Sequence, residues 1–191
     1  MPALSVVAGP NGSGKSTLTS SIWFEGNANL IDPDAIARGL SPQSPATKAI
    51  PAARQAILRC RGLLCQLQDF TLETTLSGHG AMSVMRDAKR AGYSTFLVYV
   101  ALSDPELHIE RVRLRVAQGG HDIPDADIRR RYRRSLARAP EALAMADKAV
   151  VLDNSGLYPV RMLLLEAGKV TWRADVRPAW VHALEASFST P

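Results

Sequence analysis

The 191-residue sequence has only two cysteines and no long apolar segment. Cys60 and Cys65 are too few for a disulfide framework or for a zinc site built on four cysteines. No apolar run approaches the roughly 20 residues that span a bilayer, and the N-terminus lacks the basic segment and apolar stretch of a secretion signal. We therefore expect a cytoplasmic protein with no membrane partner.

Aromatic residues make up only 6% of the chain, beside 21% charged and 46% hydrophobic residues. These values are ordinary for a globular protein and exclude a wholly disordered or fibrous chain. The length predicts a single domain over residues 1–191, with a core at about 4–156 and a C-terminal appendage at about 157–191. The net charge of +5 is compatible with nucleic acid or with a polyanionic small molecule as partner.

Short apolar runs alternate with stretches of helical periodicity. Strands are expected at residues 4–8, 29–31, 70–73, 94–102 and 149–152. Such alternation indicates βαβ units, and so predicts an α/β, three-layer fold with a mainly parallel five-stranded sheet. Residues 161–175 differ, because two apolar runs flank a turn and predict a C-terminal β-hairpin.

The segment from Gly9 to Ser16 matches the pattern G-x-x-x-x-G-K-[ST] between an expected strand and an expected helix, which indicates a P-loop NTPase or kinase fold. Glycines there let backbone N–H groups turn towards phosphate oxygens, and the helix start adds its positive dipole. We expect Lys15 to reach the β- and γ-phosphates and take part in catalysis, Ser16 to ligate Mg²⁺, and Thr17 to pack or cap the helix. The expected ATP-binding residues here are Gly9, Pro10, Asn11, Gly12, Ser13, Gly14, Lys15, Ser16 and Thr17.

Three carboxylates follow predicted strands. Asp32 and Asp34 come after the second strand, and Glu73 ends the third. In an open parallel sheet the carboxyl ends of the strands line the ligand crevice, so these acids are expected to face the phosphates. We take Asp34 as the base that accepts the acceptor's proton, with helix capping as the alternative, and Glu73 as a ligand of substrate or of metal-bound water. Asp32 is the candidate for holding the turn.

Residues 111–138, called the arginine segment below, contain nine arginines, three acids and no lysine. Guanidinium groups bind phosphate through paired hydrogen bonds, so this composition favours phosphate recognition by two to four of them. A solvated helix face is the alternative for the rest. The break at Gly119-Gly120-His121 between two expected helices predicts the hinge of a lid that closes over the γ-phosphate.

Together these motifs resemble the zeta-toxin-type kinases, and their free-standing members in particular. The likeness covers residues 4–156 and rests on the glycine-rich loop, Ile31-Asp32-Pro33-Asp34, Glu73 to Gly78, Arg115 followed by Gly119 to Pro124, and Asp153-Asn154-Ser155-Gly156. The resemblance implies ATP- and Mg²⁺-dependent phosphorylation of a hydroxyl on a small molecule, such as a UDP-N-acetylamino sugar. It also implies a separate antitoxin-like inhibitor as a partner.

The resemblance further implies roles for single residues. Arg115 and Arg130 match the charge-stabilising arginines of the catalytic set, with Arg131 as the alternative to Arg130. Asn154 falls where the adenine would pass. The expected substrate-binding residues are Asp34, Glu73, Thr75 and Arg131.

A second class of function stays open: a P-loop ATPase associated with nucleic acid or with a transporter. Residues 76–80 superficially resemble the signature sequence of ABC transporters, but they follow a predicted strand directly. Nucleic acid is disfavoured because only one aromatic residue, Tyr132, lies among the arginines. A hydroxyl-bearing small molecule is the partner that we expect.

Overall fold

The computed structural model describes residues 1–21, 25–120 and 122–188. Its strands are β1 (Ala3–Ala8), β2 (Leu30–Ile31), β3 (Phe70–Thr74), β4 (Ser94–Ala101), β5 (Lys148–Asp153), β6 (Val160–Glu166) and β7 (Lys169–Arg173). Its α-helices are α1 (Lys15–Ser21), α2 (Pro33–Leu40), α3 (Ala49–Cys65), α4 (Gly80–Arg90), α5 (Pro105–Ala117), α6 (Asp125–Met145) and α7 (Ala179–Ala186). Two short 3₁₀ helices are η1 (Asn27–Asn29) and η2 (Pro45–Lys48). No helix in the described ranges is long and apolar enough to cross a membrane.

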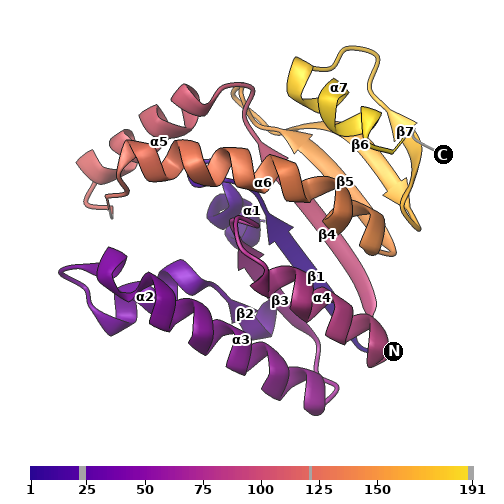
Figure 1. The fold of residues 1–191 in the computed structure, drawn as a ribbon, viewed down its shortest axis with the longest axis horizontal. Coiled ribbons are helices and arrows are strands. Elements are labelled where there is room, and N and C mark those ends of the chain that lie inside the picture. Colours follow the sequence, from indigo (N-terminus) through magenta and orange to yellow (C-terminus); the bar gives the residue numbers. More distant parts are fainter. Residues whose placement is uncertain (22–24, 121, 189–191) are drawn as a thin grey trace.

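The strands form one seven-stranded sheet in the order β2-β3-β1-β4-β5-β6-β7 (Figure 1). Strands β1 to β5 are parallel, which confirms the predicted α/β fold. The predicted hairpin is β6 and β7, and it continues the same sheet because β6 pairs antiparallel with β5. The C-terminal residues therefore extend the parallel sheet.

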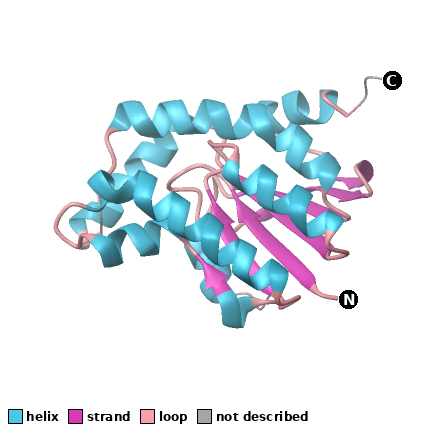
Figure 2. Ribbon diagram, turned by 60° about the horizontal axis from the view of Figure 1, so that its bottom comes forward, coloured by secondary structure: helices cyan, strands magenta, loops and turns pink. Residues whose placement is uncertain are grey.

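Helices cover the two faces of the sheet unequally. Side chains of a strand alternate between faces, so Leu4 and Val6 of β1 enter a large core with α3, α4, α6 and α7. Figure 2 shows helices lying over one face of the sheet. Val7 and Val98 point the other way and pack in a smaller core with Leu18 of α1. Among the described helices, α1 alone contributes to that second core, and it follows directly on the phosphate-binding motif.

Two helices begin at matching caps just beyond strand ends. The Asp32 carboxylate accepts a hydrogen bond from the Asp34 N–H at 2.8 Å, with Pro33 in the first helical position of α2. Asp104 caps α5 in the same way. Asp and Pro are favoured at these positions because the first N–H groups of a helix lack backbone partners. Both caps set a helix start at the carboxyl edge of the sheet.

The glycine pair after α5, which the sequence predicts to be part of a hinge, ends the helix. The Gly119 N–H donates to the Val116 carbonyl at 2.9 Å, the Gly120 N–H donates to the Arg115 carbonyl at 2.8 Å, and Gly119 has φ of 88°. This is the Schellman arrangement that ends a helix. His121, the third residue of the predicted hinge, lies outside the described residues, and lid closure stays a prediction.

Candidate active site

The loop between β1 and α1 comes into close contact with its neighbours. A Cβ on Gly9 would lie 1.9 Å from the Val100 carbonyl oxygen of β4, and one on Gly12 would lie 2.6 Å from the His108 carbonyl oxygen of α5. Both glycines also have positive φ, of 149° and 76°. Only glycine therefore fits these two positions. The Gly9 N–H donates to the Thr74 carbonyl of β3 at 3.1 Å, which fixes the start of the loop against the sheet.

Lys15 is buried in this loop. Its Nζ donates to the Pro10 carbonyl at 2.9 Å, so the side chain folds back over the loop. Burial lowers the pKa of Lys15, while the Glu73 carboxylate opposes this and the Arg115 charge adds to it. The ammonium group is thus held beside the backbone that would receive the triphosphate.

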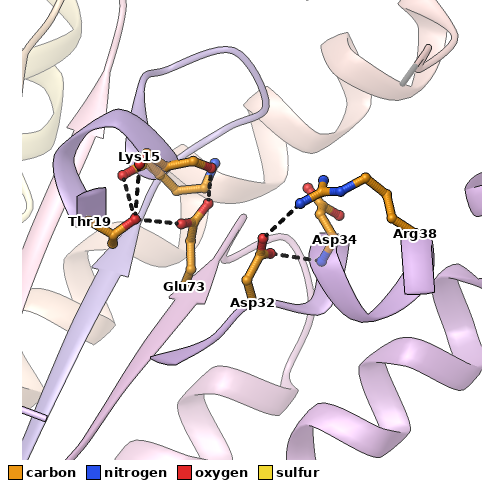
Figure 3. A network of polar contacts seen from close by, with 7 residues as sticks. Lys15, Thr19, Asp32, Asp34, Arg38 and Glu73 are labelled. Atoms are coloured by element: carbon orange, nitrogen blue, oxygen red, sulfur yellow. Dashed lines mark hydrogen bonds and ion pairs between the residues drawn. The ribbon is translucent and has the colours of Figure 1, made fainter. Parts of the chain in front are cut away.

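Glu73 is fixed by the helix that follows the loop. Ser16 Oγ donates to Glu73 Oε1 at 2.8 Å, and Thr19 Oγ1 donates to Glu73 Oε2 at 3.1 Å (Figure 3). Burial raises the pKa of Glu73, and Lys15 and both hydroxyls oppose that shift. The sequence analysis missed Thr19, although a residue four positions after Lys15 lies on the same helix face.

The oxygen atoms around Ser16 fit magnesium. Its hydroxyl and the Glu73 carboxylate are hard oxygen ligands of the kind that Mg²⁺ prefers. No group of three or more His, Cys, Asp or Glu among the described residues could hold a metal ion. Mg²⁺ commonly takes one or two protein oxygens and completes its shell with phosphate and water. The Ser16 hydroxyl and the Glu73 carboxylate therefore fit a magnesium site that the triphosphate and water would complete.

A cavity of about 360 Å³ opens beside the phosphate loop. The carboxyl ends of β2 and β3, together with α6, supply most of its polar lining. Six of the residues predicted from the sequence line it: Lys15, Asp34, Glu73, Thr75, Arg130 and Arg131. Neither Arg115 nor Asn154 is among the described residues that do so. The structure thus brings the predicted base, the loop lysine and two of the arginines to one space.

Asp34 faces this cavity without acting as the helix cap. Asp32 takes that role, and its second carboxylate oxygen lies 3.5 Å from Arg38 Nη2. Asp34 also lines a second cavity of about 310 Å³ between α2 and the start of α6. Burial raises the pKa of Asp32, and the charge of Asp34 adds to the shift. The capping alternative for Asp34 is therefore excluded.

Arg130 and Arg131 have different partners. Arg130 Nη2 lies 2.9 Å from Asp127 Oδ1, one turn earlier on α6. Arg131 Nη1 donates to Asn11 Oδ1 in the phosphate loop at 3.1 Å. Of these two neighbours, Arg131 is the one that contacts the phosphate loop. Arg115, near the end of α5, is exposed.

Two predicted ATP-binding residues have supporting or peripheral positions. Asn154 Nδ2 donates to the Ser13 carbonyl at 2.9 Å, so Asn154 braces the loop from the end of β5, and its contact with adenine stays a prediction. Thr17 is exposed on α1, and the predicted packing role is wrong. Leu18 and Thr19 take the buried positions of that helix instead.

His108 is a buried residue of the site that the sequence analysis missed. An amide N–H can only donate, so the Leu102 N–H donates to His108 Nε2 at 3.2 Å. Nδ1 then carries the ring proton and donates to the Asn11 carbonyl at 2.7 Å. Burial lowers the pKa of His108 to about 4. The signal in the sequence was a single histidine on the face of α5 that also carries Val112.

We expect the protein to lose stability as the pH falls from about 6.5 towards 4. In the unfolded chain the His108 side chain takes up a proton near the ordinary histidine pKa of 6.5. In the folded protein the ring stays neutral over this range, because its pKa is about 4. Between pH 7 and pH 5 this difference amounts to roughly 2 kcal/mol. Urea unfolding of wild type, His108→Asn and the exposed control His182→Gln measures it. Equal pH dependence in wild type and His108→Asn contradicts the prediction.

A family model described as "AAA domain" (AAA_33) matches residues 4–139. The chain belongs to this family. The chain is also 38% identical over 126 residues to an uncharacterised protein of Haemophilus influenzae, an alignment that covers 65% of the chain and 88% of that protein.

Solved structures of low sequence identity share the fold. The crystal structure of AvrRxo1-ORF1:-ORF2 with ATP matches 99% of the chain with a TM-score of 0.72 and 15% identity, and the chain spans 64% of that protein's length. The PezAT chromosomal toxin-antitoxin system of Streptococcus pneumoniae gives a TM-score of 0.60 at 14% identity, covering 98% of this chain and 85% of that one. The chain thus has the α/β fold of P-loop kinases.

Proposed function

We propose that the protein is an ATP-dependent kinase that transfers the γ-phosphate to a hydroxyl group of a small molecule, as the zeta-toxin-type kinases do. The observation that carries this proposal is the single cavity lined by Lys15, Asp34 and Arg131. Phosphoryl transfer to a second substrate needs such a space, with a proton acceptor beside the phosphate loop. An ATPase that drives only mechanical work has no use for an acceptor cavity.

In this proposal Asp34 accepts the proton of the acceptor hydroxyl while that oxygen bonds to the γ-phosphorus. The bond between the γ-phosphorus and the bridging oxygen breaks, and ADP leaves with the electron pair. Lys15 and Arg131 stabilise the negative charge on the phosphoryl oxygens. Ser16 and Glu73 would hold Mg²⁺, which neutralises charge on the β- and γ-phosphates when bound.

The test is ADP release from Mg-ATP by the purified protein with separate acceptors: sugars, nucleosides, dinucleotides and UDP-N-acetylamino sugars. We expect ADP formation to depend on one class of hydroxyl acceptor and to disappear in Lys15→Ala. Stimulation by DNA or RNA and by no small acceptor would instead support the nucleic-acid ATPase.

The proposal extends to a protein partner. AvrRxo1-ORF1 is in complex with ORF2, and PezAT is described as a toxin-antitoxin system. We propose that a separate inhibitor protein likewise binds this chain in the cytoplasm. Suppression of ADP release by a candidate inhibitor, at a ratio of one to one, is the expected result.

Mg-ATP is expected to raise the melting temperature through binding at the phosphate loop. A ligand at 100 times its Kd adds about 2.7 kcal/mol to stability, which corresponds to about 5–10 °C for a chain of this size. Thermal unfolding with and without Mg-ATP measures the shift. Lys15→Ala is expected to lose most of it, and an equal shift in both proteins would place ATP elsewhere.

A further inference from the structure

Three arginines share one face of α6. Arg131, Arg134 and Arg138 follow one another at intervals of three and four residues, which places them in a row along the helix. The first is bonded to Asn11 of the phosphate loop. The row therefore begins at the phosphate loop and runs away from it.

The last arginine of the row is also engaged. Arg138 Nη1 donates to the Ser77 carbonyl at 3.1 Å, and Nη2 lies 3.2 Å from His79 Nε2. These contacts fix this part of α6 over the loop between β3 and α4. The middle of the row therefore lies between two anchored positions.

Arg134, in the middle, is exposed at the edge of the helix, has no hydrogen bond or ion pair to any described residue, and lines the 360 Å³ cavity. Arg129 and Arg130 of the same helix pair with Glu106 and Asp127. Arg134 is thus a cation of the cavity that the chain itself does not neutralise.

The loop opposite this stretch of α6 offers hydroxyl groups and no carboxylate. Thr75 Oγ1 lies 2.9 Å from Ser77 Oγ, and both residues line the cavity with Gly78. The acids of the cavity come from the start of α2 and the end of β3 instead. Apolar side chains, most of them alanines, form another part of the wall, among them Ala49, Ala53, Ala56, Ile57 and Ala81.

We propose that Arg134 binds an anionic group of the acceptor, so that the acceptor is a small hydroxylated carboxylate or phosphate ester. The proposal rests on the kinase function, which places the acceptor in this cavity. A guanidinium without an internal partner forms strong charge-assisted hydrogen bonds with either anion, and Thr75 and Ser77 can bind neighbouring hydroxyls. About 360 Å³ is near the lower end for ligand pockets and suits a molecule of monosaccharide size.

Binding can be tested without knowing the acceptor. The full chain is first saturated with Mg²⁺ and a non-hydrolysable ATP analogue, which fills the phosphate loop, and is then titrated calorimetrically with inorganic phosphate or with acetate. Arg134→Gln is expected to weaken anion binding about tenfold or more. Arg133→Gln is the matched control, because Arg133 is adjacent, is exposed as Arg134 is, and is not among the residues that line the cavity. It should bind as wild type does.

The two anions distinguish the two chemistries. Binding of phosphate alone indicates a phosphate ester, whereas binding of acetate as well indicates a carboxylate. Equal affinity in Arg134→Gln and Arg133→Gln, or absence of anion binding by the wild type, overturns the proposal.

ADP release with glucose, glucose 6-phosphate and gluconate separates this proposal from the kinase function. One outcome is that the protein binds anions through Arg134 and yet phosphorylates none of these acceptors. That result would support the anion site and contradict the kinase function. Phosphorylation of neutral acceptors that Arg134→Gln leaves unchanged would support the kinase and refute the anion site.

Discussion

Asp34→Asn is expected to lower the rate of phosphoryl transfer about 10²- to 10⁴-fold while leaving ATP binding in place. The amide has the shape of the carboxylate, but it cannot accept the proton of the acceptor hydroxyl. Because Asp32 caps α2, the change at Asp34 removes no helix cap. Initial rates of ADP release, the Kd of ATP and the melting temperature together measure the effect.

Asp32→Asn is the matched control for this prediction. Asparagine is also a good helix cap, so α2 is expected to stay intact. Its loss of activity should be at least tenfold smaller than that of Asp34→Asn. Full activity in Asp34→Asn would remove Asp34 from the chemistry, and equal losses in both variants would indicate a shared electrostatic effect in place of a base.

Arg131→Ala is expected to lower kcat by about 10³- to 10⁵-fold, the range for arginines that stabilise charge during phosphoryl transfer. The reason is its bond to Asn11, which places the guanidinium at the phosphate loop. Arg130→Ala should cost much less, since Arg130 is paired with Asp127 on its own helix. Steady-state kcat and KM for ATP and acceptor distinguish the two.

Arg129→Ala provides the baseline for this comparison. Its guanidinium forms two 2.8 Å hydrogen bonds with the Glu106 carboxylate at the surface, outside the cavity. We expect wild-type kcat from this variant. If Arg130→Ala is inactive and Arg131→Ala is active, then Arg130 is the charge-stabilising arginine, as the sequence analysis expected.

The convergence of Lys15, Asp34 and Glu73 could be predicted from the sequence, because each follows a strand of a parallel sheet and those ends share one edge. The choice between Arg130 and Arg131 could not. Adjacent residues of a helix point about 100° apart, so the rotation of α6 decides which one reaches the loop.

The role of the glycines after α5 is a second feature that the sequence alone could not predict. A glycine pair between helices is compatible with a hinge and with a Schellman cap, and the sequence does not show the Gly119 and Gly120 hydrogen bonds that form the cap. The role of His108 is a third such feature, because a histidine among apolar helix positions does not indicate which two backbone groups it bridges.

Asn11 joins the phosphate loop to both helices of the arginine segment, through its carbonyl to His108 and through its side chain to Arg131. We therefore expect nucleotide affinity and the arrangement of α5 and α6 to be thermodynamically linked, because a nucleotide at the loop would act on both contacts. Linkage is reciprocal: if ATP shifts the helices, then any molecule that fixes the helices changes ATP affinity by the same factor. On this prediction, the inhibitor protein proposed above would change ATP affinity by binding the outer surface of α5 and α6, without entering the phosphate loop.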